Sequence, residues 1–198
     1  MTDRLLTGER GAQVWRGGGV TVHVLDPVAD AGVLHEWVTR PGAGFFGLTE
    51  LTPDELRETY EFVESLPTHH AYLVRSAGEP VAMVQLYHPE DDPVATAYDV
   101  RPGDVGAHFV LGSRRPGWAE LGPALLACAF APPAVRRVVV EPDVRHRAAL
   151  ARMVALGFEP AGEVRYDSPH GPKDAMLAFL TRERAEALVP ALRPLPAG

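Results

Sequence analysis

The sequence predicts an α/β (α+β) domain built on a twisted mixed sheet of about seven strands that is flanked by helices. Three observations predict this fold class. Segments with strand-like alternation and segments with helical spacing follow each other along most of the chain. Two apolar runs joined by Ala-Gly-Glu-Pro at 77–80 indicate an antiparallel hairpin. A strand, a helix and a strand between 104 and 142 indicate a right-handed parallel crossover.

The chain begins with one strand and two helices. The alternating segment VTVHVL (20–25) is typical of a strand, and 26–38 follows with apolar residues at helical spacing. In 52–66, Thr52 is the expected N-cap and Pro53 the first helical residue, with acidic residues in the first turn. These signals predict a β-α-α start.

The middle of the chain supplies the hairpin and the crossover. The hairpin occupies 70–88, and 104–112 is a further strand. A turn then leads to an apolar helix at 118–131 and to 135–142, a short apolar strand of the kind that is buried on both faces.

The last part returns to antiparallel structure. A helix at 144–157 ends at Gly157, a typical C-terminal glycine. Two strands follow at 158–168 and 175–181, and a short helix at 182–192 precedes the Pro-rich end.

Composition favours one globular domain over 1–198. Hydrophobic residues make up 46% and charged residues 23% of the 198 residues, which is ordinary globular usage. We expect 1–18 and 191–198 to be poorly ordered extensions of that domain. Cys128, the only cysteine, lies in an apolar helix, so we expect a buried thiol.

The net charge limits the classes of molecule that this protein is expected to bind. The net charge is −7 and only one of 19 basic residues is lysine, which argues against nucleic-acid binding and suits an amine substrate. The start of the chain has no signal-peptide pattern, and no apolar run reaches the roughly 18 residues of a membrane span. We expect a cytoplasmic monomer or homodimer without a membrane partner.

The hexapeptide RRPGWA (114–119) lies between a predicted strand and a predicted helix. Free N–H groups and the positive end of a helix dipole bind phosphate groups, and Gly117 lets the backbone approach such a ligand closely. Arg114 and Arg115 add positive charge, while Pro116 removes one donor. The alternative is a solvated turn. The position before a helix favours the phosphate site.

The element order, RRPGWA and the segments 98–112, 138–158 and 173–183 together resemble the GNAT superfamily of acyl-CoA-dependent N-acyltransferases. RRPGWA is similar to its pyrophosphate-binding pattern of Arg or Gln, two residues, Gly, one residue, and Gly or Ala. The segments look like the branch of the aerobactin and mycobactin type, which acylates N-hydroxylated lysine, ornithine or diamine (cadaverine) precursors of hydroxamate siderophores for iron acquisition. The resemblance covers 34–183 and implies the GNAT fold, in which a central parallel pair of strands splays to admit CoA.

The resemblance implies two catalytic residues. His108 would take a proton from the amine, and Asp143 would orient the imidazole or the substrate. The alternatives are a hydrogen-bonded core histidine and a cap for the helix that starts near Val144. An acceptor with oxygen on its nitrogen is weakly basic and would demand little of His108, whereas a charged alkyl amine would need it far more.

The resemblance also implies binding residues. The residues expected at acyl-CoA, with acetyl-CoA the first candidate, are Phe109, Val110, Leu111, Arg114, Arg115, Gly117, Trp118, Ala119 and His146. The residues expected at the amine are Trp37, Phe45, Phe46, Tyr98 and Asp99. The first three of these could instead be core or dimer contacts.

One position departs from the family pattern. Met153 stands where many relatives carry a tyrosine that protonates the departing thiolate. A methionine has no proton to give, so another group or a water must do so, and Met153 is expected to pack in the core. No metal is implied, because the remaining histidines have no partner at the spacing of a metal site.

These inferences predict an acyltransferase that moves an acyl group from acyl-CoA to an N-hydroxylated amine. Two alternatives stay open. One is acetylation of a different amine such as an aminoglycoside, which the acidic surface would suit. The other is a module that binds acyl-CoA without catalysis.

Overall fold

The computed structural model describes residues 4–40, 44–169 and 171–189, without the side chain of Phe46. One eight-stranded sheet has the order β1-β2-β3-β4-β5-β6-β8-β7. Its strands are β1 (Gln13–Gly17), β2 (Val20–Val24), β3 (His69–Ser76), β4 (Glu79–Tyr87), β5 (Asp104–Leu111), β6 (Arg137–Val140), β7 (Glu159–Ser168) and β8 (Gly171–Thr181). The α-helices are α1 (Pro27–Val38), α2 (Pro53–Ser65), α3 (Trp118–Ala129), α4 (Arg147–Ala155) and α5 (Arg182–Leu188). Three 3-10 helices are η1 (Gly44–Phe46), η2 (Pro89–Asp91) and η3 (Pro93–Thr96). The predicted fold class is confirmed.

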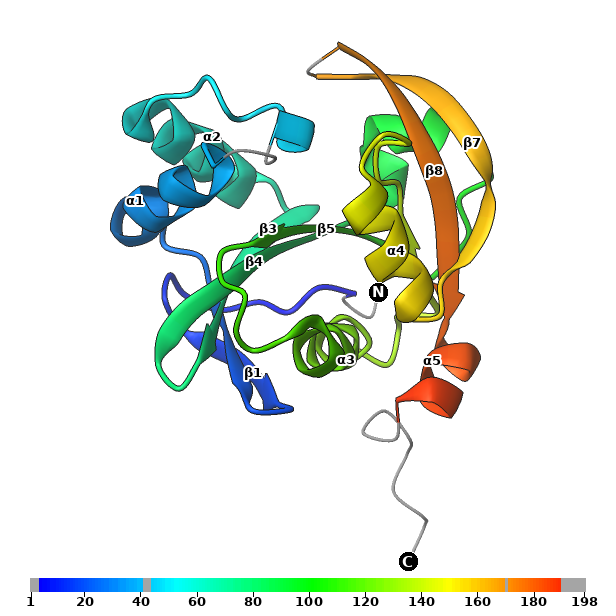
Figure 1. Cartoon of the computed structure of the whole chain (residues 1–198), viewed down its shortest axis with the longest axis horizontal. Helices are drawn as coiled ribbons and strands as arrows, with labels where there is room; N and C mark the ends of the chain where they lie inside the picture. Colours follow the sequence, from blue (N-terminus) through cyan, green and yellow to red (C-terminus); the bar gives the residue numbers. More distant parts are fainter. Residues whose placement is uncertain (1–3, 41–43, 170, 190–198) are drawn as a thin grey trace, which may run out of the picture.

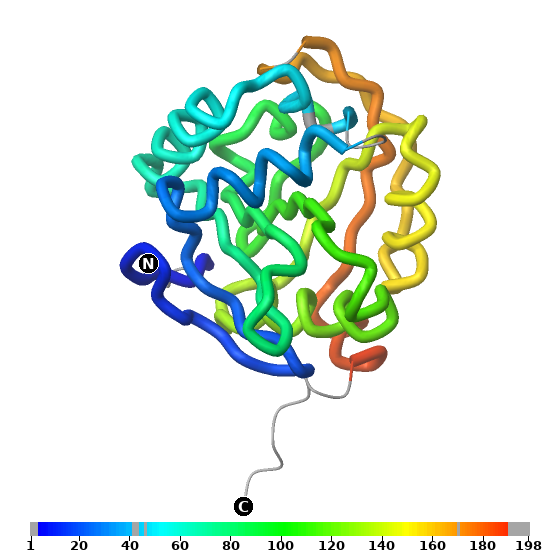
Figure 2. The backbone as a smooth tube through the Cα atoms, turned by 60° about the vertical axis from the view of Figure 1, so that its left-hand side comes forward, coloured from blue at the N-terminus to red at the C-terminus, as the bar shows by residue number. Residues whose placement is uncertain are grey.

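Helices cover both faces of the sheet (Figure 1). On one face, α1 and α2 bury Leu34 and Leu56 against β3, β4 and β5. On the other face, α3 buries Leu121 and Leu125, and α4 and α5 add Met153 and Ala185 to the same core. Figure 2 shows α4 beside β7 and β8, on the side of the molecule remote from α2. No helix in the described ranges is long and apolar enough to cross a membrane.

The start of α2 follows from its sequence as predicted. The Thr52 hydroxyl accepts the N–H of Glu55, and the Glu55 carboxylate accepts the N–H of Thr52. This capping box, with Pro53 as the first helical residue, satisfies N–H groups that a helix start would leave free. It fixes where α2 begins.

The central parallel pair, β5 and β6, diverges after three residues. Asp104–Gly106 pair with Arg137–Val139 and no further. β5 then continues along β4 to Leu111, whereas the chain after β6 follows β8, where the Pro142 carbonyl accepts the N–H of Met176 at 2.9 Å. Pro142 has no N–H to offer to β5. The carboxyl ends of the two strands therefore separate, at the place where α/β sheets bind ligands.

The N-terminal region differs from the prediction that 1–18 lies outside the ordered domain. Gln13–Gly17 form the edge strand β1, which pairs with β2, and Leu5 is buried. Gly18 and Gly19 both have positive φ, 56° and 79°, which is the turn geometry that a two-residue hairpin loop requires. In the sequence, three successive glycines look like a flexible linker. The sheet therefore has eight strands, while 191–198 lie outside the described residues.

Candidate functional site

A cleft of about 1410 Å³ opens where β5 and β6 diverge. One wall is formed by α2 and η1, and the opposite wall by α4 and the adjoining ends of β7 and β8 (Figures 1 and 2). The carboxyl half of β5 forms its floor. Ligand pockets for small molecules commonly measure about 300–1,000 Å³, so this cleft has room for a large ligand together with a second, smaller one.

Three titratable side chains meet where the strands separate. The His108 Nε2 atom lies 2.5 Å from Glu141 Oε1, and the Lys173 Nζ atom lies 3.1 Å from the same oxygen. Glu141 is 2% exposed, whereas the side chains of His108 and Lys173 are 32% and 23% exposed. A buried carboxylate therefore holds one imidazole and one ammonium group at the surface of the cleft.

The parallel register brings His108 to Glu141. Gly106 and Val139 are the last paired residues, and His108 and Glu141 each come two residues later on the same face. Lys173 arrives from the start of β8, which runs beside the chain that follows β6. Glu141 is not among the residues predicted from the sequence. The signal that could have found it is the register itself, because both partners stand at the same distance beyond the parallel pairing.

The charges beside Glu141 outweigh its burial. Burial alone would raise the pKa of this carboxyl, but the charges and hydrogen bonds of His108 and Lys173 hold its pKa well below the usual range. Glu141 is therefore ionised at neutral pH. Its second oxygen, Oε2, is buried and has no hydrogen bond of normal geometry among the described residues. The hydroxyl of Tyr166 also interacts with this carboxylate, so His108 and Lys173 are not its only polar neighbours.

The buried ring of Tyr87 packs against the imidazole of His108. The Tyr87 ring lies between two histidines, with its centroid 5.0 Å from that of His108 and 5.3 Å from that of His69. Burial first, and then the charge of Glu141, raise the pKa of Tyr87, so its hydroxyl stays protonated. A Cβ atom on Gly106 would lie 2.1 Å from the Tyr87 ring. Glycine at this position leaves the space that the ring occupies.

Asp143 lines the cleft but is held by Arg145. Its carboxylate receives the Arg145 side chain at 2.7 and 2.9 Å and the Arg145 N–H at 2.8 Å. These hydrogen bonds lower the pKa of Asp143. The carboxylate bonded to His108 is that of Glu141, which corrects the expectation that Asp143 orients the imidazole. The chain has already turned toward β8 at Asp143, which bridges to Ala175. A role of Asp143 toward the substrate stays a prediction.

The loop between β5 and α3 contains the predicted diphosphate site. Gly117 is the N-cap of α3 and no side chain caps this helix, so first-turn N–H groups remain available to a ligand. Arg114, Pro116 and Trp118 line the cleft, whereas Arg115, Gly117 and Ala119 do not. Gly117 has an ordinary φ of −66°, and a Cβ atom there would meet nothing within 4 Å. The fold does not need this glycine, but a ligand that approaches the backbone would.

We expect Gly117→Ser to weaken CoA binding without destabilising the fold. Serine is a favourable N-cap, and its hydroxyl would take the N–H groups that a diphosphate needs. The Kd for CoA, measured by titration calorimetry, should rise about tenfold, which corresponds to about 1.4 kcal/mol. The midpoint of thermal unfolding should stay level or rise. Unchanged affinity in this variant would contradict a diphosphate site at the start of α3.

The β5 residues predicted at acyl-CoA, Phe109, Val110 and Leu111, all line the cleft. His146, also predicted there, lines the wall opposite η1 and stacks on Phe45 with ring centroids 4.4 Å apart. Burial and then the charge of Arg152 lower the pKa of His146, so its imidazole is neutral at pH 7. The stack joins the two walls of the cleft.

Trp37 and Met153 belong mainly to the core. Trp37 is 4% exposed, and a Cβ atom on Gly112 would lie 1.9 Å from its ring. It therefore supports the end of β5, although its edge reaches the cleft. Met153 packs in the core between α3 and α4, as predicted. Phe46 was expected at the amine, but its side chain lies outside what the structure describes.

Tyr98 and Asp99 do not line the cleft, which corrects their expected role at the amine. The Tyr98 hydroxyl donates to Asp104 at 3.2 Å, and its ring lies 5.4 Å from that of Phe179. Asp104 starts β5, whereas the cleft lies at the other end of this strand. Tyr98 thus stabilises the end of the parallel pair at which β5 and β6 remain hydrogen-bonded to each other.

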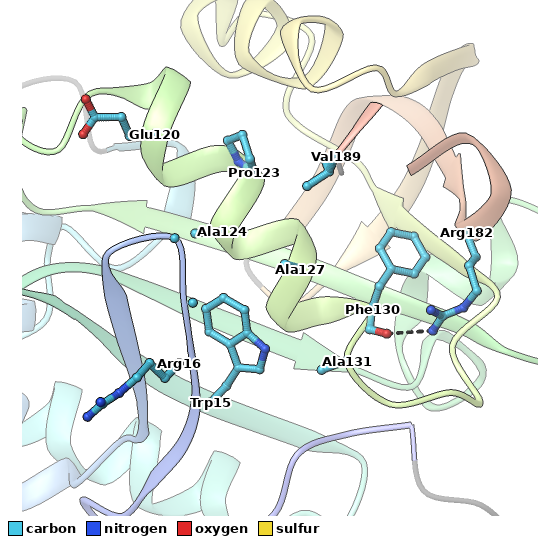
Figure 3. A pocket seen from close by; sticks show the side chains of 12 residues that line it. Trp15, Arg16, Glu120, Pro123, Ala124, Ala127, Phe130, Ala131, Arg182 and Val189 are labelled. Atoms are coloured by element: carbon cyan, nitrogen blue, oxygen red, sulfur yellow. Dashed lines mark hydrogen bonds between the residues drawn. The ribbon is translucent and has the colours of Figure 1, made fainter. Parts of the chain in front are cut away.

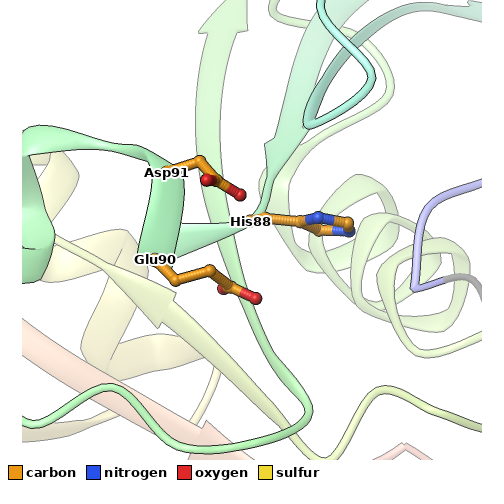
Figure 4. A group of neighbouring side chains, drawn as sticks. All are labelled: His88, Glu90 and Asp91. Carbon is orange, nitrogen blue, oxygen red and sulfur yellow. The ribbon is translucent and has the colours of Figure 1, made fainter. Parts of the chain in front are cut away.

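One group of side chains has the composition of a metal site. Ligand atoms of His88, Glu90 and Asp91 lie within 4.8 Å of one another (Figure 4), an arrangement that the sequence spacing did not suggest. Glu90 is bound through both carboxylate oxygens to Arg4, and both acids are exposed. A guanidinium already satisfies one of the three candidate ligands, Glu90, so this group does not fit a resident metal.

A second cavity of about 440 Å³ lies between the β1–β2 hairpin and α3 (Figure 3). Trp15, Pro123 and Phe130 supply much of its wall. Arg182 at its edge donates to the carbonyl groups of Phe130, Pro132 and Val135. This guanidinium therefore stabilises the local backbone. Among the residues that line the cavity there is no acid–base pair comparable to that of the large cleft.

A family model matches more than half of the chain. The model of the acetyltransferase (GNAT) domain family matches residues 26–166. The lysine N-acyltransferase MbtK of Mycobacterium sp. (strain MCS) is 29% identical over 163 residues, which is 76% of this chain and 67% of that protein.

Solved structures share the fold. An uncharacterized protein of Bacillus halodurans has a TM-score of 0.78 at 19% identity, over 93% of this chain and 97% of that one. Aminoglycoside acetyltransferase AAC(6')-Ib, in complex with coenzyme A and kanamycin, has a TM-score of 0.67 at 24% identity, over 85% and 98%. Spermidine N-acetyltransferase from Vibrio cholerae, in complex with CoA and spermine, has a TM-score of 0.65 at 13% identity, over 86% and 99%.

Proposed function

Because the chain belongs to the GNAT acetyltransferase family and is therefore an acyltransferase, we propose that it transfers an acyl group from acyl-CoA to an N-hydroxylated amine. The acceptor would be of the hydroxylysine, hydroxyornithine or hydroxycadaverine type, in hydroxamate siderophore biosynthesis. The observation that carries this choice is the shared contact of His108 and Lys173 with Glu141. The similarity to a lysine N-acyltransferase supports it.

The donor would lie along the diverging strands. Its diphosphate would bind the N–H groups at the start of α3, with Arg114 beside them. The pantetheine arm would follow β5 past Phe109, Val110 and Leu111. This path ends at the gap between β5 and β6, so the thioester carbonyl would reach the surface of His108.

The charges at the base favour an acceptor that arrives neutral. Lys173 already serves as counter-ion to Glu141, so the carboxylate has little attraction left for a charged ammonium group. An alkyl amine has a pKa near 10.4 and is almost fully protonated at pH 7. An oxygen on the nitrogen lowers this basicity, so an N-hydroxy amine presents a free lone pair.

His108 would then act as the base. With Nε2–H donated to Glu141, the proton acceptor is Nδ1. The nitrogen lone pair attacks the thioester carbon, the nitrogen proton passes to Nδ1, and the carbon–sulfur bond breaks. The departing thiolate takes a proton from water or from another group, since Met153 has none to give. His108 is returned to its neutral form by loss of its proton to solvent.

A second candidate acceptor is an aminoglycoside. Asp91 and Asp92 line the cleft near His69 and would attract a polycation. A structural neighbour is an aminoglycoside acetyltransferase in complex with kanamycin, although at 24% identity the likeness shows the fold alone. The two candidates differ in the charge of the attacking nitrogen.

Steady-state kinetics with matched acceptors separate the candidates. We expect kcat/KM for N-hydroxycadaverine to exceed that for cadaverine by about 10²-fold or more at pH 7, because only a small fraction of the plain amine is neutral. Kanamycin serves as the second acceptor, and each is offered with acetyl, succinyl and longer acyl-CoA thioesters. Equal values for the two diamines would contradict the proposal, and turnover of kanamycin alone would favour the second candidate.

A further inference from the structure

Lys173 is the single lysine of this chain and it stands at the proposed site of acyl transfer. Its Nζ atom contacts the same Glu141 oxygen as His108 Nε2. Lys173 is the third residue of β8. Its side chain is 23% exposed, so its end lies at the cleft surface. The other 18 of the 19 Lys and Arg residues are arginines. Their guanidinium groups stay charged and therefore do not act as acyl acceptors.

We propose that Lys173 is a site of self-acylation: when acyl-CoA is bound without an acceptor, the Lys173 amine attacks the thioester. This inference rests on the proposed use of acyl-CoA. Lys173 is a primary amine on a flexible chain of four carbons, so it offers a nitrogen nucleophile as the proposed acceptors do, but without their hydroxyl group. It differs from them in being tethered beside the base.

The step balances without a further reactant. The Lys173 ammonium group gives one proton to His108, and its lone pair forms a bond to the thioester carbonyl carbon. The carbon–sulfur bond breaks, the second nitrogen proton is lost as the amide forms, and the thiolate leaves with one proton as free CoA. The net products are an acyl-lysine amide, CoA and one proton released to solvent.

Acylation would remove the charge that compensates Glu141. An amide has no positive charge, so the buried carboxylate would lose its ammonium partner and keep its contact with His108. The charge balance around Glu141, which positions the base, would then change. The acyl group would also project into the part of the cleft where an acceptor must enter. Self-acylated protein is therefore expected to be inactive.

Intact-mass spectrometry of the full chain tests this inference. The protein is incubated with acetyl-CoA at pH 8.5 without acceptor, because a higher pH increases the neutral fraction of the amine. We expect one added acetyl group, found on the peptide that contains Lys173, and a loss of transfer activity in proportion to the labelled fraction. Lys173→Arg should gain no acetyl group on that peptide, and His108→Gln should be labelled at least about tenfold more slowly.

Four outcomes test the inference against the proposed function. Absence of the label in protein that binds CoA by calorimetry would overturn the inference. Equal labelling rates in native and urea-unfolded protein would also overturn it, because the fold would then contribute nothing. Labelling of Lys173 without turnover of any N-hydroxy amine would retain the inference and reject the proposed acceptor, whereas turnover without labelling would do the reverse.

Discussion

Replacing His108 by alanine is expected to lower kcat/KM for a plain alkyl amine by about 10²- to 10⁴-fold, the usual contribution of a positioned general base. The loss for an N-hydroxy acceptor should be smaller, about tenfold, because this nitrogen already presents a free lone pair at pH 7. The variant removes the imidazole that contacts Glu141 while leaving the β5 backbone in place. Steady-state kinetics with cadaverine and N-hydroxycadaverine measure both losses.

Two controls separate chemistry from binding and folding. The Kd for CoA should change little, because the proposed diphosphate site lies at the start of α3. His69→Ala removes the histidine on the other side of Tyr87, which has no bond to Glu141, and should cost far less activity. Equal losses in the two histidine variants would indicate that both act through the ring packing, and His108 would then not be the base.

Local signals in the sequence predicted most of the fold. The Thr52-Pro53 start of α2, the hairpin at Ala77–Pro80 and the crossover around α3 each depend on residues close together in the chain. The strand β1 was missed because its five residues carry little alternation and end in the first of three successive glycines. Its strand character comes from pairing with β2, which is a tertiary effect that periodicity does not report.

The site was harder to predict, because the register of the β5–β6 pairing decides which side chains meet there. In the sequence, Glu141 and Asp143 are two carboxylates beside one proline, and the resemblance favoured the second. In the structure, the parallel pairing of β5 with β6 decides between them, because it sets Glu141 opposite His108. Asp143 satisfies the local bonds of Arg145 instead. The position of Lys173 depends on the pairing of β8 with β6, which no local pattern encodes.

Gly106 affects both the stability of the fold and the position of the His108 ring, because it adjoins Tyr87. It is the last β5 residue paired with β6, and the Tyr87 ring lies against the position that its Cβ atom would take, 2.1 Å away. Tyr87 is fully buried and lies against His108, so the ring has no free space into which to move. We expect Gly106→Ala to lower the free energy of unfolding by about 3 kcal/mol, at the upper end for overpacking of a core.

Urea unfolding measures this loss, and Gly32→Ala is the matched control. Gly32 lies in α1, where an added Cβ atom would meet nothing within 4 Å, so the same substitution should stabilise the protein by up to about 1 kcal/mol. The opposite signs exclude a general effect of replacing glycine. Because a displaced Tyr87 would also move the His108 ring, folded Gly106→Ala protein should lose transfer activity while Gly32→Ala keeps it. Wild-type stability in Gly106→Ala would mean that the ring does not support the base, and the arrangement of His108 would need another cause.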